Sequence, residues 1–557
     1  MPPDLQGLLV SDFTADPLAA FLNLPEWPSC RMQTLRFGEP CVHETPVDFS
    51  VIWTQAAGTM PAFGRVLRFE NVTEEELLAD CDVFIDTVRK NFSSSRFVFV
   101  MSWTLPYFLR GYGPLDLRQA GGWRRALMTV NRHVIDALSK MPNTYVLDTE
   151  RWLQAIGEKS CDPRLWYLGK IPFDQAVFKL AAGDIKAALG ACLGKSRKII
   201  VLDLDDTLWG GIVGECGWEN LRIGGHDAQG EAYTDFQRAL KALQCRGVVL
   251  AIVSKNDEAV ALEAMERHPE MVLKRGDFVA WRINWKDKAA NIQELLAQLN
   301  LTHEAAVFID DNPLERARIK EALPGVLVPE WPQNSLLYTK ALWSLSCFDT
   351  VVVSADDRRR TDMYVQERIR QDLRGQAQGL DQWLASLGTV VNIEPLSPAN
   401  LPRATQLLNK TNQMNLSTRR LTEDEFKIWS EDPKHQVWAF RVCDRLGDSG
   451  LVGLASLQLH EERGRVVDFI LSCRVFGRKI EQVMMGMLVT WSRKQGVDRL
   501  TAEYRPTQKN KPCLEFLCSH PGFLRREYVF EWDFSHDYSM PAGITVQDAE
   551  SAQLMEM

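Results

Sequence analysis

The sequence has few of the features that mark secreted or membrane-embedded proteins. No stretch approaches 18 uninterrupted apolar residues, so no membrane-spanning helix is expected. Met1–Thr14 contains no basic region followed by a long apolar run, so no signal peptide is expected. The twelve cysteines are scattered and include no C-x-x-C pair, which indicates reduced thiols that mostly pack in cores. We therefore expect a cytoplasmic protein without a membrane partner.

An excess of positive charge is also absent. The formal net charge of the chain is −9, which argues against nonspecific binding to nucleic acids or to anionic membranes. An apolar content of 45% is ordinary for globular proteins, and a chain of 557 residues suggests about three domains. Apolar strands that alternate with helical segments favour the α/β class.

The most informative stretch is Ile199–Gly217, which reads IIVLDLDDTLWGGIVGECG. Its four apolar residues predict a buried parallel strand, and the polar residues after them would lie where open α/β sheets hold ligands. Asp203 and Asp205 are two residues apart, so on a strand both carboxylates would face one side. Because two such carboxylates repel each other, a hard cation such as Mg²⁺ would stabilise them.

Three later segments supply further polar groups in sequence order. The first is a strand that ends in a hydroxyl, the second a helix that begins with lysines, and the third a strand that ends in an acidic pair. They are Val248–Asp257 with Ser254, Trp285–Ile292 with Lys286 and Lys288, and Val307–Arg316 with Asp310 and Asp311.

These motifs resemble those of a known enzyme superfamily. The string DLDDTLWGG, residues 203–211, carries the D-x-D-x-T signature of the HAD superfamily of phosphotransferases. The string WGGIVGECG, residues 209–217, resembles the FkbH-like branch, subfamily IIIC. The resemblance implies a Rossmann-like parallel sheet and phosphoryl transfer, a reaction that needs mainly positioning and charge neutralisation.

The resemblance also implies a role for each strand-end group. Asp203 would be the nucleophile that forms an aspartyl phosphate, and Asp205 would protonate the leaving group and then activate water. Ser254 would donate a hydrogen bond to a phosphoryl oxygen. Lys288 would neutralise charge on the nucleophile and the phosphate. Lys286 is the rival for this role, and we prefer Lys288 because it opens the helical run.

The same resemblance implies a magnesium site. Its ligands would be the Asp203 carboxylate, the Asp205 backbone carbonyl and Asp311. Asp310 and Thr207 would support these ligands. The segments between the motifs have room for a flap, helices and strands but not for a separate cap domain, which favours a large or tethered substrate.

Residues 1–190 are predicted to form a first α/β domain that resembles SGNH hydrolases. The catalytic residues of that family are missing. Where the family has G-D-S, this chain has Ser11-Asp12-Phe13, and where it has D-x-x-H, the final residue is Leu165. Without nucleophile and base the catalytic triad cannot operate. We expect a degenerate domain for binding or docking.

Residues 195–345 are assigned to the HAD-like domain, whose glycine-rich flap follows the first motif. Cys216 lies in this flap. FkbH-like glyceryltransferases are thought to carry the acyl group on an enzyme thiol, and Cys216 is a candidate for it. The alternative is an incidental cysteine.

Residues 346–535 resemble the GNAT-like α+β domain of FkbH proteins, and a disordered tail is predicted for 542–557. The turn that binds the coenzyme A pyrophosphate in GNAT enzymes reads Arg474–Lys479 here. Lys479 replaces a small residue, which disfavours free acetyl-CoA and leaves a pantetheine arm as the candidate ligand, with ordinary loop polarity as the alternative. The predicted cleft residues are Asn412, Asn415, Arg474, Gly477, Arg478, Tyr504 and Asn510.

Taken together, the resemblance implies an enzyme with Mg²⁺ as cofactor. FkbH-like members take a glyceryl unit from 1,3-bisphosphoglycerate, remove phosphate and load the unit onto the phosphopantetheine thiol of an acyl carrier protein in polyketide or related biosynthesis. One alternative is a HAD phosphatase acting on another phosphorylated metabolite or carrier-bound group. A second alternative is a non-catalytic assembly scaffold.

Overall fold

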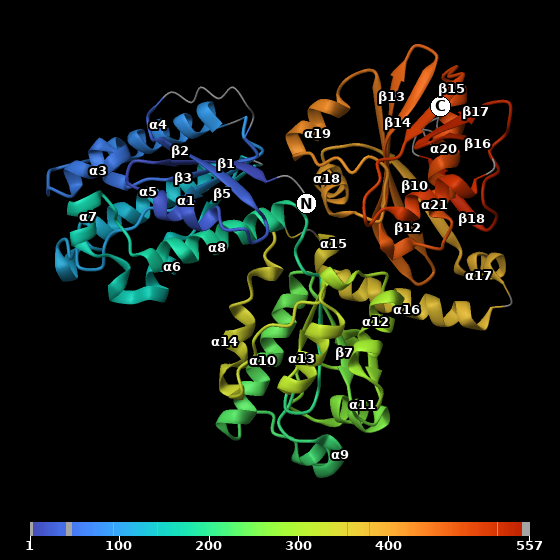
Figure 1. The fold of residues 1–557 in the computed structure, drawn as a ribbon, viewed down its shortest axis with the longest axis horizontal. Coiled ribbons are helices and arrows are strands. Elements are labelled where there is room, and N and C mark those ends of the chain that lie inside the picture. The colour runs from blue at the N-terminus through green and yellow to red at the C-terminus, as the bar shows by residue number, and fades with distance from the viewer. Residues whose placement is uncertain are drawn as a thin grey trace. The chain divides into compact units, whose positions relative to one another are not determined.

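A computed structural model gives the fold of residues 4–548, apart from 40–46, 93, 142, 352, 354, 378 and 521. The chain divides into two compact units, Met1–Cys192 and Leu193–Met557 (Figure 1). The second unit contains two separate sheets, so it includes both of the later predicted domains. Among the helices of the described residues, none has the length and apolar character needed to cross a membrane.

The first unit is built on a five-stranded parallel sheet with the order β2-β1-β3-β4-β5. The strands are β1 (Leu5–Ser11), β2 (Cys30–Arg36), β3 (Phe49–Trp53), β4 (Phe97–Met101) and β5 (Thr144–Leu147). The helices are α1 (Asp16–Leu22), α2 (Ala56–Thr59), α3 (Pro61–Val66), α4 (Glu74–Phe92), α5 (Trp123–Leu138), α6 (Thr149–Ile156), α7 (Pro163–Gly169) and α8 (Gln175–Cys192). Every residue of β3 and β4 is buried, as expected for a parallel sheet covered on both faces.

Phe13, the residue at the position where the sequence lacks a predicted hydrolase nucleophile, belongs to the core of the first unit. Phe13 is buried and packs edge-to-face against Trp53 and Phe173, with ring centroids 5.9 and 6.0 Å apart. Asp162 caps helix α7 by accepting a hydrogen bond from the Arg164 N–H. Both positions therefore serve folding, which is consistent with the predicted loss of hydrolase chemistry.

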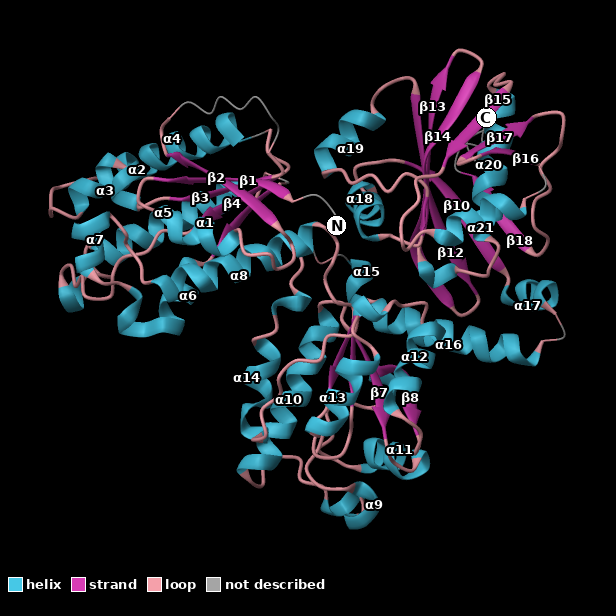
Figure 2. Ribbon diagram, in the orientation of Figure 1, coloured by secondary structure: helices cyan, strands magenta, loops and turns pink. Residues whose placement is uncertain are grey.

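The parallel sheet of the second unit has four strands in the order β8-β7-β6-β9. Figure 2 shows part of this sheet, with β7 and β8 labelled. The strands are β6 (Ile199–Leu202), β7 (Val249–Ser254), β8 (Phe278–Ile283) and β9 (Ala306–Ile309). The helices are α9 (Val213–Cys216), α10 (Ala228–Cys245), α11 (Glu258–Arg267), α12 (Lys288–Gln298), α13 (Pro313–Ala322) and α14 (Tyr338–Trp343). All residues between 143 and 351 are described, and no cap domain interrupts this part of the chain.

Side chains of the central strand alternate between two helical layers. Ile200 and Leu202 belong to the core that includes α10 and α11, whereas Ile199 and Val201 belong to the core that includes α12 and α13. Alternation with a period of two is a property of any β-strand. Asp203 continues the register of Ile199 and Val201, so it emerges on the side of α12.

The other sheet of the second unit is mixed and contains nine strands. The order is β16-β17-β15-β14-β13-β12-β10-β18, and β11 pairs with β14. The strands are β10 (Thr389–Pro395), β11 (Met414–Asn415), β12 (His435–Asp444), β13 (Gly447–His460), β14 (Arg463–Leu471), β15 (Arg499–Glu503), β16 (Phe523–Arg526), β17 (Val529–Asp533) and β18 (Ile544–Asp548). The helices are α15 (Ala355–Arg358), α16 (Arg360–Gln376), α17 (Leu380–Leu387), α18 (Leu401–Lys410), α19 (Glu423–Ser430), α20 (Ile480–Lys494) and α21 (Lys511–Ser519).

One boundary prediction is wrong. The disordered tail was predicted to begin at residue 542, but Ile544–Asp548 forms strand β18 and pairs in parallel with Thr389–Ile393 of β10. Pairing with an edge strand satisfies the backbone groups of a segment that has few aromatic residues of its own. The rest of the predicted tail, 549–557, lies outside the described residues.

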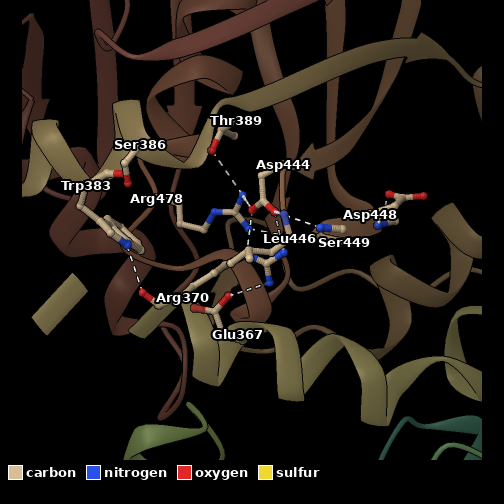
Figure 3. A network of polar contacts seen from close by, with 12 residues as sticks. Glu367, Arg370, Trp383, Ser386, Thr389, Asp444, Leu446, Asp448, Ser449 and Arg478 are labelled. Carbon is tan, nitrogen blue, oxygen red and sulfur yellow. Dashed lines mark hydrogen bonds and ion pairs between the residues drawn. The ribbon is translucent and has the colours of Figure 1, made fainter. Parts of the chain in front are cut away.

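A buried ion network joins helix α16 to the mixed sheet (Figure 3). Arg370 binds Asp444 with two hydrogen bonds of 2.7 and 2.9 Å, and Arg478 reaches the same carboxylate at 2.7 Å. Glu367 lies 3.4 Å from Arg370. The side chains of Asp444 and Arg478 have no exposed surface. Helix α16 is rich in charged residues, yet Arg370 is buried.

We predict that Asp444→Ala strongly destabilises the second unit. The substitution leaves two buried guanidinium groups without their shared carboxylate, and breaking a buried pair in this way costs about 3–5 kcal/mol. The measurement is the denaturant midpoint of the full chain. Asp448→Ala is the matched control because that aspartate is partly exposed and its pairing with Arg441 contributes at most about 1 kcal/mol. Equal midpoints for the two variants would contradict the assigned role of the network.

Candidate active site

The candidate site lies at the carboxyl ends of the central strands β6 and β9. These strands are parallel neighbours, with Leu202 opposite Ile309. Asp203 follows β6, and its N–H donates to the carbonyl of Ile309 at 3.1 Å. Asp310 and Asp311 follow β9 directly. The sheet register therefore brings together carboxylates that are more than 100 residues apart in the sequence.

Lys288 is the cation at the centre of this site. It is the first residue of helix α12, and Asp287 caps that helix through a hydrogen bond with the Ala290 N–H. The Lys288 Nζ lies 3.2 Å from Asp203 Oδ1 and 2.6 Å from Asp310 Oδ2. Burial by itself favours the neutral amine, but the two carboxylates outweigh it and raise the pKa of Lys288. The lysine is therefore a fixed positive charge beside Asp203.

The three carboxylates fit a divalent cation. Oxygen atoms of Asp203, Asp310 and Asp311 lie within 4.8 Å of one another. Asp203 Oδ1 is buried, and it contacts Lys288 through an ion pair of 3.2 Å without a well-directed hydrogen bond. Burial, together with the charge of Asp203, raises the pKa of Asp310 to about 6 and also raises the pKa of Asp311. A hard cation with oxygen ligands would relieve this accumulation of negative charge.

The carboxylates are unequal in their remaining capacity to bind. Asp310 uses one oxygen for Lys288 and the other for the Asn312 N–H at 2.9 Å, so it is suited to support rather than to ligate. Asp311 accepts from the Thr207 hydroxyl at 3.3 Å and is only partly buried. Asp203 and Asp311 would therefore hold the cation directly. The predicted roles of Asp310, Asp311 and Thr207 in metal binding stay predictions, and the geometry places all three residues at the site.

Asp205 is held apart from the three carboxylates by its own hydrogen bonds. Its Oδ1 accepts from the Trp209 indole at 2.9 Å and from the Val213 N–H at 3.1 Å. Its Oδ2 accepts from the Asn256 side chain at 2.8 Å. Burial is the main cause that raises the pKa of Asp205, with Asp203 adding to it. A carboxyl group with a raised pKa is suited to hold and transfer a proton.

The other predicted residues take distinct places. Ser254 ends strand β7 and is buried, so it lies at the same edge of the sheet as Asp203. Lys286 is exposed, and its backbone N–H donates to Asn284. Of the two candidate lysines, only Lys288 is paired with the carboxylates.

Sequence reasoning did not identify several residues that hold the site. Asn256 fixes Asp205, and its position two residues after Ser254 was an available signal. Arg316 is buried on α13 and donates from Nη1 to the carbonyls of Asp310 and Asp311 at 2.7 and 2.6 Å. The Tyr338 hydroxyl donates to the Asp206 carbonyl at 3.1 Å, and no local pattern connects these two residues.

A cavity of about 660 Å³ adjoins Asp311 and contains the flap cysteine. Its lining includes Asp206, Glu215, Cys216, Asp311 and Tyr338. The Cys216 thiol lies 3.2 Å from the Ile212 carbonyl. Burial and the nearby carboxylates raise the pKa of Cys216, so the thiolate is disfavoured there. Cys216 is placed to meet a ligand, but its surroundings do not activate it as a nucleophile.

The residues predicted for a pantetheine cleft do not line a single cavity. Asn412 and Arg474 line a cavity. Arg478 is fully buried and bound to Asp444, so it cannot contact a ligand. Asn510 accepts from the Tyr504 hydroxyl at 2.7 Å and donates to the Asn415 carbonyl at 2.9 Å, and all three of these residues are buried.

The predicted contacts at Asn415, Arg478, Tyr504 and Asn510 are therefore corrected to structural roles. The physical reason is that strand β11 pairs with β14 and brings Asn415 against Asn510. Gly477 adopts a φ of 75°, which suits the turn before α20, and no described cavity includes it.

Comparison with solved structures supports the phosphatase fold. Neither a protein-family model nor a curated protein matches the chain. The chain is similar to the crystal structure of the N-terminal part of the protein BF1531 from Bacteroides fragilis, which contains a phosphatase domain complexed with Mg. The identity is 26%, the match covers 63% of this chain and 95% of that chain, and the TM-score is 0.56.

Two acetyltransferase structures match a smaller part of the chain. The ribosomal-protein-S18-alanine N-acetyltransferase from Escherichia coli is 15% identical, covers 26% of this chain and 95% of that chain, and has a TM-score of 0.21. An acetyltransferase of the GNAT family from Staphylococcus aureus Mu50 is 12% identical. The match covers 26% of this chain and 98% of that chain, and the TM-score is 0.21. The predicted fold class, α/β with parallel sheets followed by a mixed sheet, is confirmed.

We predict that Mg²⁺ stabilises the full chain more at about pH 7.5 than at about pH 5. The pKa of Asp310 lies near 6, so its ionised form costs stability as the pH rises through 6, and a bound cation offsets that cost. Protons compete with the cation at lower pH. The measurement is the melting temperature with and without Mg²⁺, and a concentration of 100 times Kd would contribute about 2.7 kcal/mol.

Asp311→Asn should abolish most of this stabilisation, whereas Asp235→Asn, an exposed change on α10, should leave it intact. An equal magnesium effect in both variants would place the cation elsewhere.

Proposed function

We propose that the second unit is a Mg²⁺-dependent phosphatase or phosphotransferase of the HAD type. The observation that carries this proposal is the buried Asp203 carboxylate. Its Oδ1 lies 3.2 Å from Lys288 Nζ, and one of its oxygens lies within 4.8 Å of oxygens of Asp310 and Asp311. A nucleophilic carboxylate needs such neighbours to approach an anionic phosphate. The presence of Mg in the similar phosphatase-domain structure supports the choice of cation.

The residues suggest a reaction in two steps. An Asp203 oxygen attacks phosphorus while the bond from phosphorus to the leaving-group oxygen breaks, and that oxygen takes the proton of Asp205. Asp205 then removes a proton from water, which attacks the aspartyl phosphate and releases phosphate and Asp203. Lys288 holds the nucleophile in place through both steps. The cation, when bound, supplies charge neutralisation to the phosphoryl oxygens.

The finer proposal concerns the substrate. We infer an FkbH-like activity with two parts. The phosphopantetheine thiol of an acyl carrier protein attacks the acyl carbon of 1,3-bisphosphoglycerate and displaces its acyl phosphate as inorganic phosphate. The remaining phosphate, an ester, is removed at Asp203, so that a glyceryl thioester stays on the carrier. Two observations support a substrate that is large or tethered. Residues 143–351 contain no cap domain, and a cavity of about 660 Å³ lies beside Asp311. The first unit, with an SGNH-like sheet and no nucleophile at Phe13, would serve docking.

We predict that Asp203→Asn abolishes phosphate release from a small acyl phosphate or aryl phosphate, because the amide cannot form an aspartyl phosphate. Lys288→Gln should reduce the rate by at least about 100-fold, as expected for loss of a fixed charge aimed at the reacting group. The exposed Lys286→Gln is the matched control and should change the rate by less than about two-fold. Full activity in Asp203→Asn would overturn the assignment of the nucleophile.

We also predict a glyceryl mass increment on a phosphopantetheinylated carrier protein from the same gene neighbourhood. The experiment mixes the full chain, Mg²⁺, carrier and 1,3-bisphosphoglycerate generated in place, and the readout is intact-protein mass spectrometry. The Asp203→Asn variant serves as the negative control. Phosphate release without any increment on the carrier would favour a phosphatase of another phosphorylated metabolite.

A further inference from the structure

The second unit contains another cavity, of about 120 Å³, whose lining is rich in basic residues. Six cationic side chains contribute to it: Lys198, Arg360, Arg403, Lys410, Arg474 and Lys509. They come from the start of β6, from α16, from α18, from the turn before α20 and from the turn before α21. No aspartate or glutamate is among its lining residues.

This cavity lies at the amino-terminal ends of the strands of the parallel sheet, whereas Asp203 lies at their carboxyl ends. Lys198 directly precedes β6, and Thr302 and Ala305 precede β9, whereas Asp203 and Asp310 follow these strands. Five residues of strand span about 16 Å. A ligand in this cavity is therefore separated from Asp203 by the length of β6. The two sites cannot hold the same phosphoryl group.

Two of the lysines lack an acidic partner. Among the described ion pairs, none involves the side chain of Lys198 or of Lys410. Asp357 is the carboxylate that acts on Lys410, but it already binds Arg360 and accepts from Gln406 at 2.8 Å.

The backbone holds one of these lysines rigidly. The Lys198 N–H donates to the Ala305 carbonyl at 2.8 Å, and its carbonyl accepts from Val249 at 2.9 Å. The main chain of Lys198 is thus fixed at the start of β6, beside the cavity.

Burial and neighbouring cations disfavour the protonated forms of Lys410 and Lys198. Burial and the adjacent Arg360, Lys198 and Arg403 lower the pKa of Lys410 to about 8, with Asp357 opposing them. Burial, with Arg360 and other cations adding to it, also lowers the pKa of Lys198. An anion in the cavity would remove this cost by binding the protonated lysines.

Neutral donors complete the lining. Thr411, Asn412, Gln413 and Ser472 all contribute to the cavity. Asn412 uses its Oδ1 to accept from Arg420 at 2.6 Å, which leaves its amide group as a donor. Hydroxyl and amide donors beside guanidinium groups are the usual partners of phosphate oxygens.

We propose that this basic cavity binds the phosphate group of a ligand, separately from the reaction at Asp203. Its volume of about 120 Å³ is sufficient for a phosphate group, which has five non-hydrogen atoms. The phosphate belongs either to a free phosphorylated metabolite or to the prosthetic arm of a carrier protein. Because the inference does not use the chemistry of Asp203, it stands even if the proposed activity fails.

The test titrates inorganic phosphate, pyrophosphate and 4′-phosphopantetheine into the full-length Asp203→Asn variant in EDTA, so that the catalytic site contributes little binding. Calorimetry measures the affinity. We expect at least one of these probes to bind, and Lys410→Gln added to this background to weaken that binding at least ten-fold. Lys340→Gln, an exposed change on α14, is the matched control and should leave the affinity unchanged.

A second variant tests the site without removing a lysine. Asn412→Asp is nearly isosteric and keeps the acceptor for Arg420, but it places a negative charge in the lining. We expect it to weaken anion binding at least ten-fold without lowering the melting temperature of the ligand-free protein. This variant keeps the test decisive if Lys410→Gln does not fold.

The outcomes separate the two sources of phosphate. Phosphopantetheine that binds more tightly than both phosphate and pyrophosphate would identify a carrier arm. Equal binding of phosphate and phosphopantetheine would identify a free phosphorylated ligand. Absence of binding for all three probes, or affinities that neither cavity variant changes, would overturn the proposal.

Discussion

The candidate active site depends on the ion pairs of Lys288. Its ammonium group lies between Asp203 and Asp310, and without it three buried or half-buried carboxylates would face one another. The position of that ammonium is set by ordinary folding forces: the Asp287 cap starts helix α12, and the apolar face of α12 packs on the same side of β6 from which Asp203 emerges. The charge arrangement is thus a consequence of strand register and helix capping.

The parallel sheet carries opposite charges at its two edges. Carboxylates collect after β6 and β9, and basic groups collect before them, where the mixed sheet and α16 contribute further cations. Each cluster is unfavourable by itself, and each is matched to a ligand of the opposite sign: a divalent cation at one edge and a phosphate group at the other. Such pairs of mutually repelling groups persist in folded proteins mainly where a ligand compensates them.

Buried polar residues of the mixed-sheet domain show that a polar sequence segment does not by itself identify a ligand-binding site. Asn415, Arg478, Tyr504 and Asn510 look like the lining of a polar cleft in the sequence, yet each is buried and bound to protein groups. Asp444 decides the role of Arg478, because it neutralises that guanidinium and the one of Arg370 together. Asn415 and Arg478 find partners 95 and 34 residues away, so no local pattern distinguishes these two from ligand-binding residues.

The sequence by itself determined the parts of this protein that depend on local order. The apolar run before Asp203, the hydroxyl at Ser254 and the acidic pair at residues 310 and 311 predict parallel strands with polar ends, because strand periodicity and the ligand-binding edge of α/β sheets are local rules. The sequence also favoured Lys288 over Lys286, because Lys288 begins a helix, and the structure adds its contact with Asp203. Tertiary structure alone decided that Arg316 and Tyr338 hold the carbonyls of the acidic loops, and that six basic residues surround one cavity. These results require the register of β6 against β9 and the packing of helices far apart in the chain, and such contacts leave no periodic trace in the sequence.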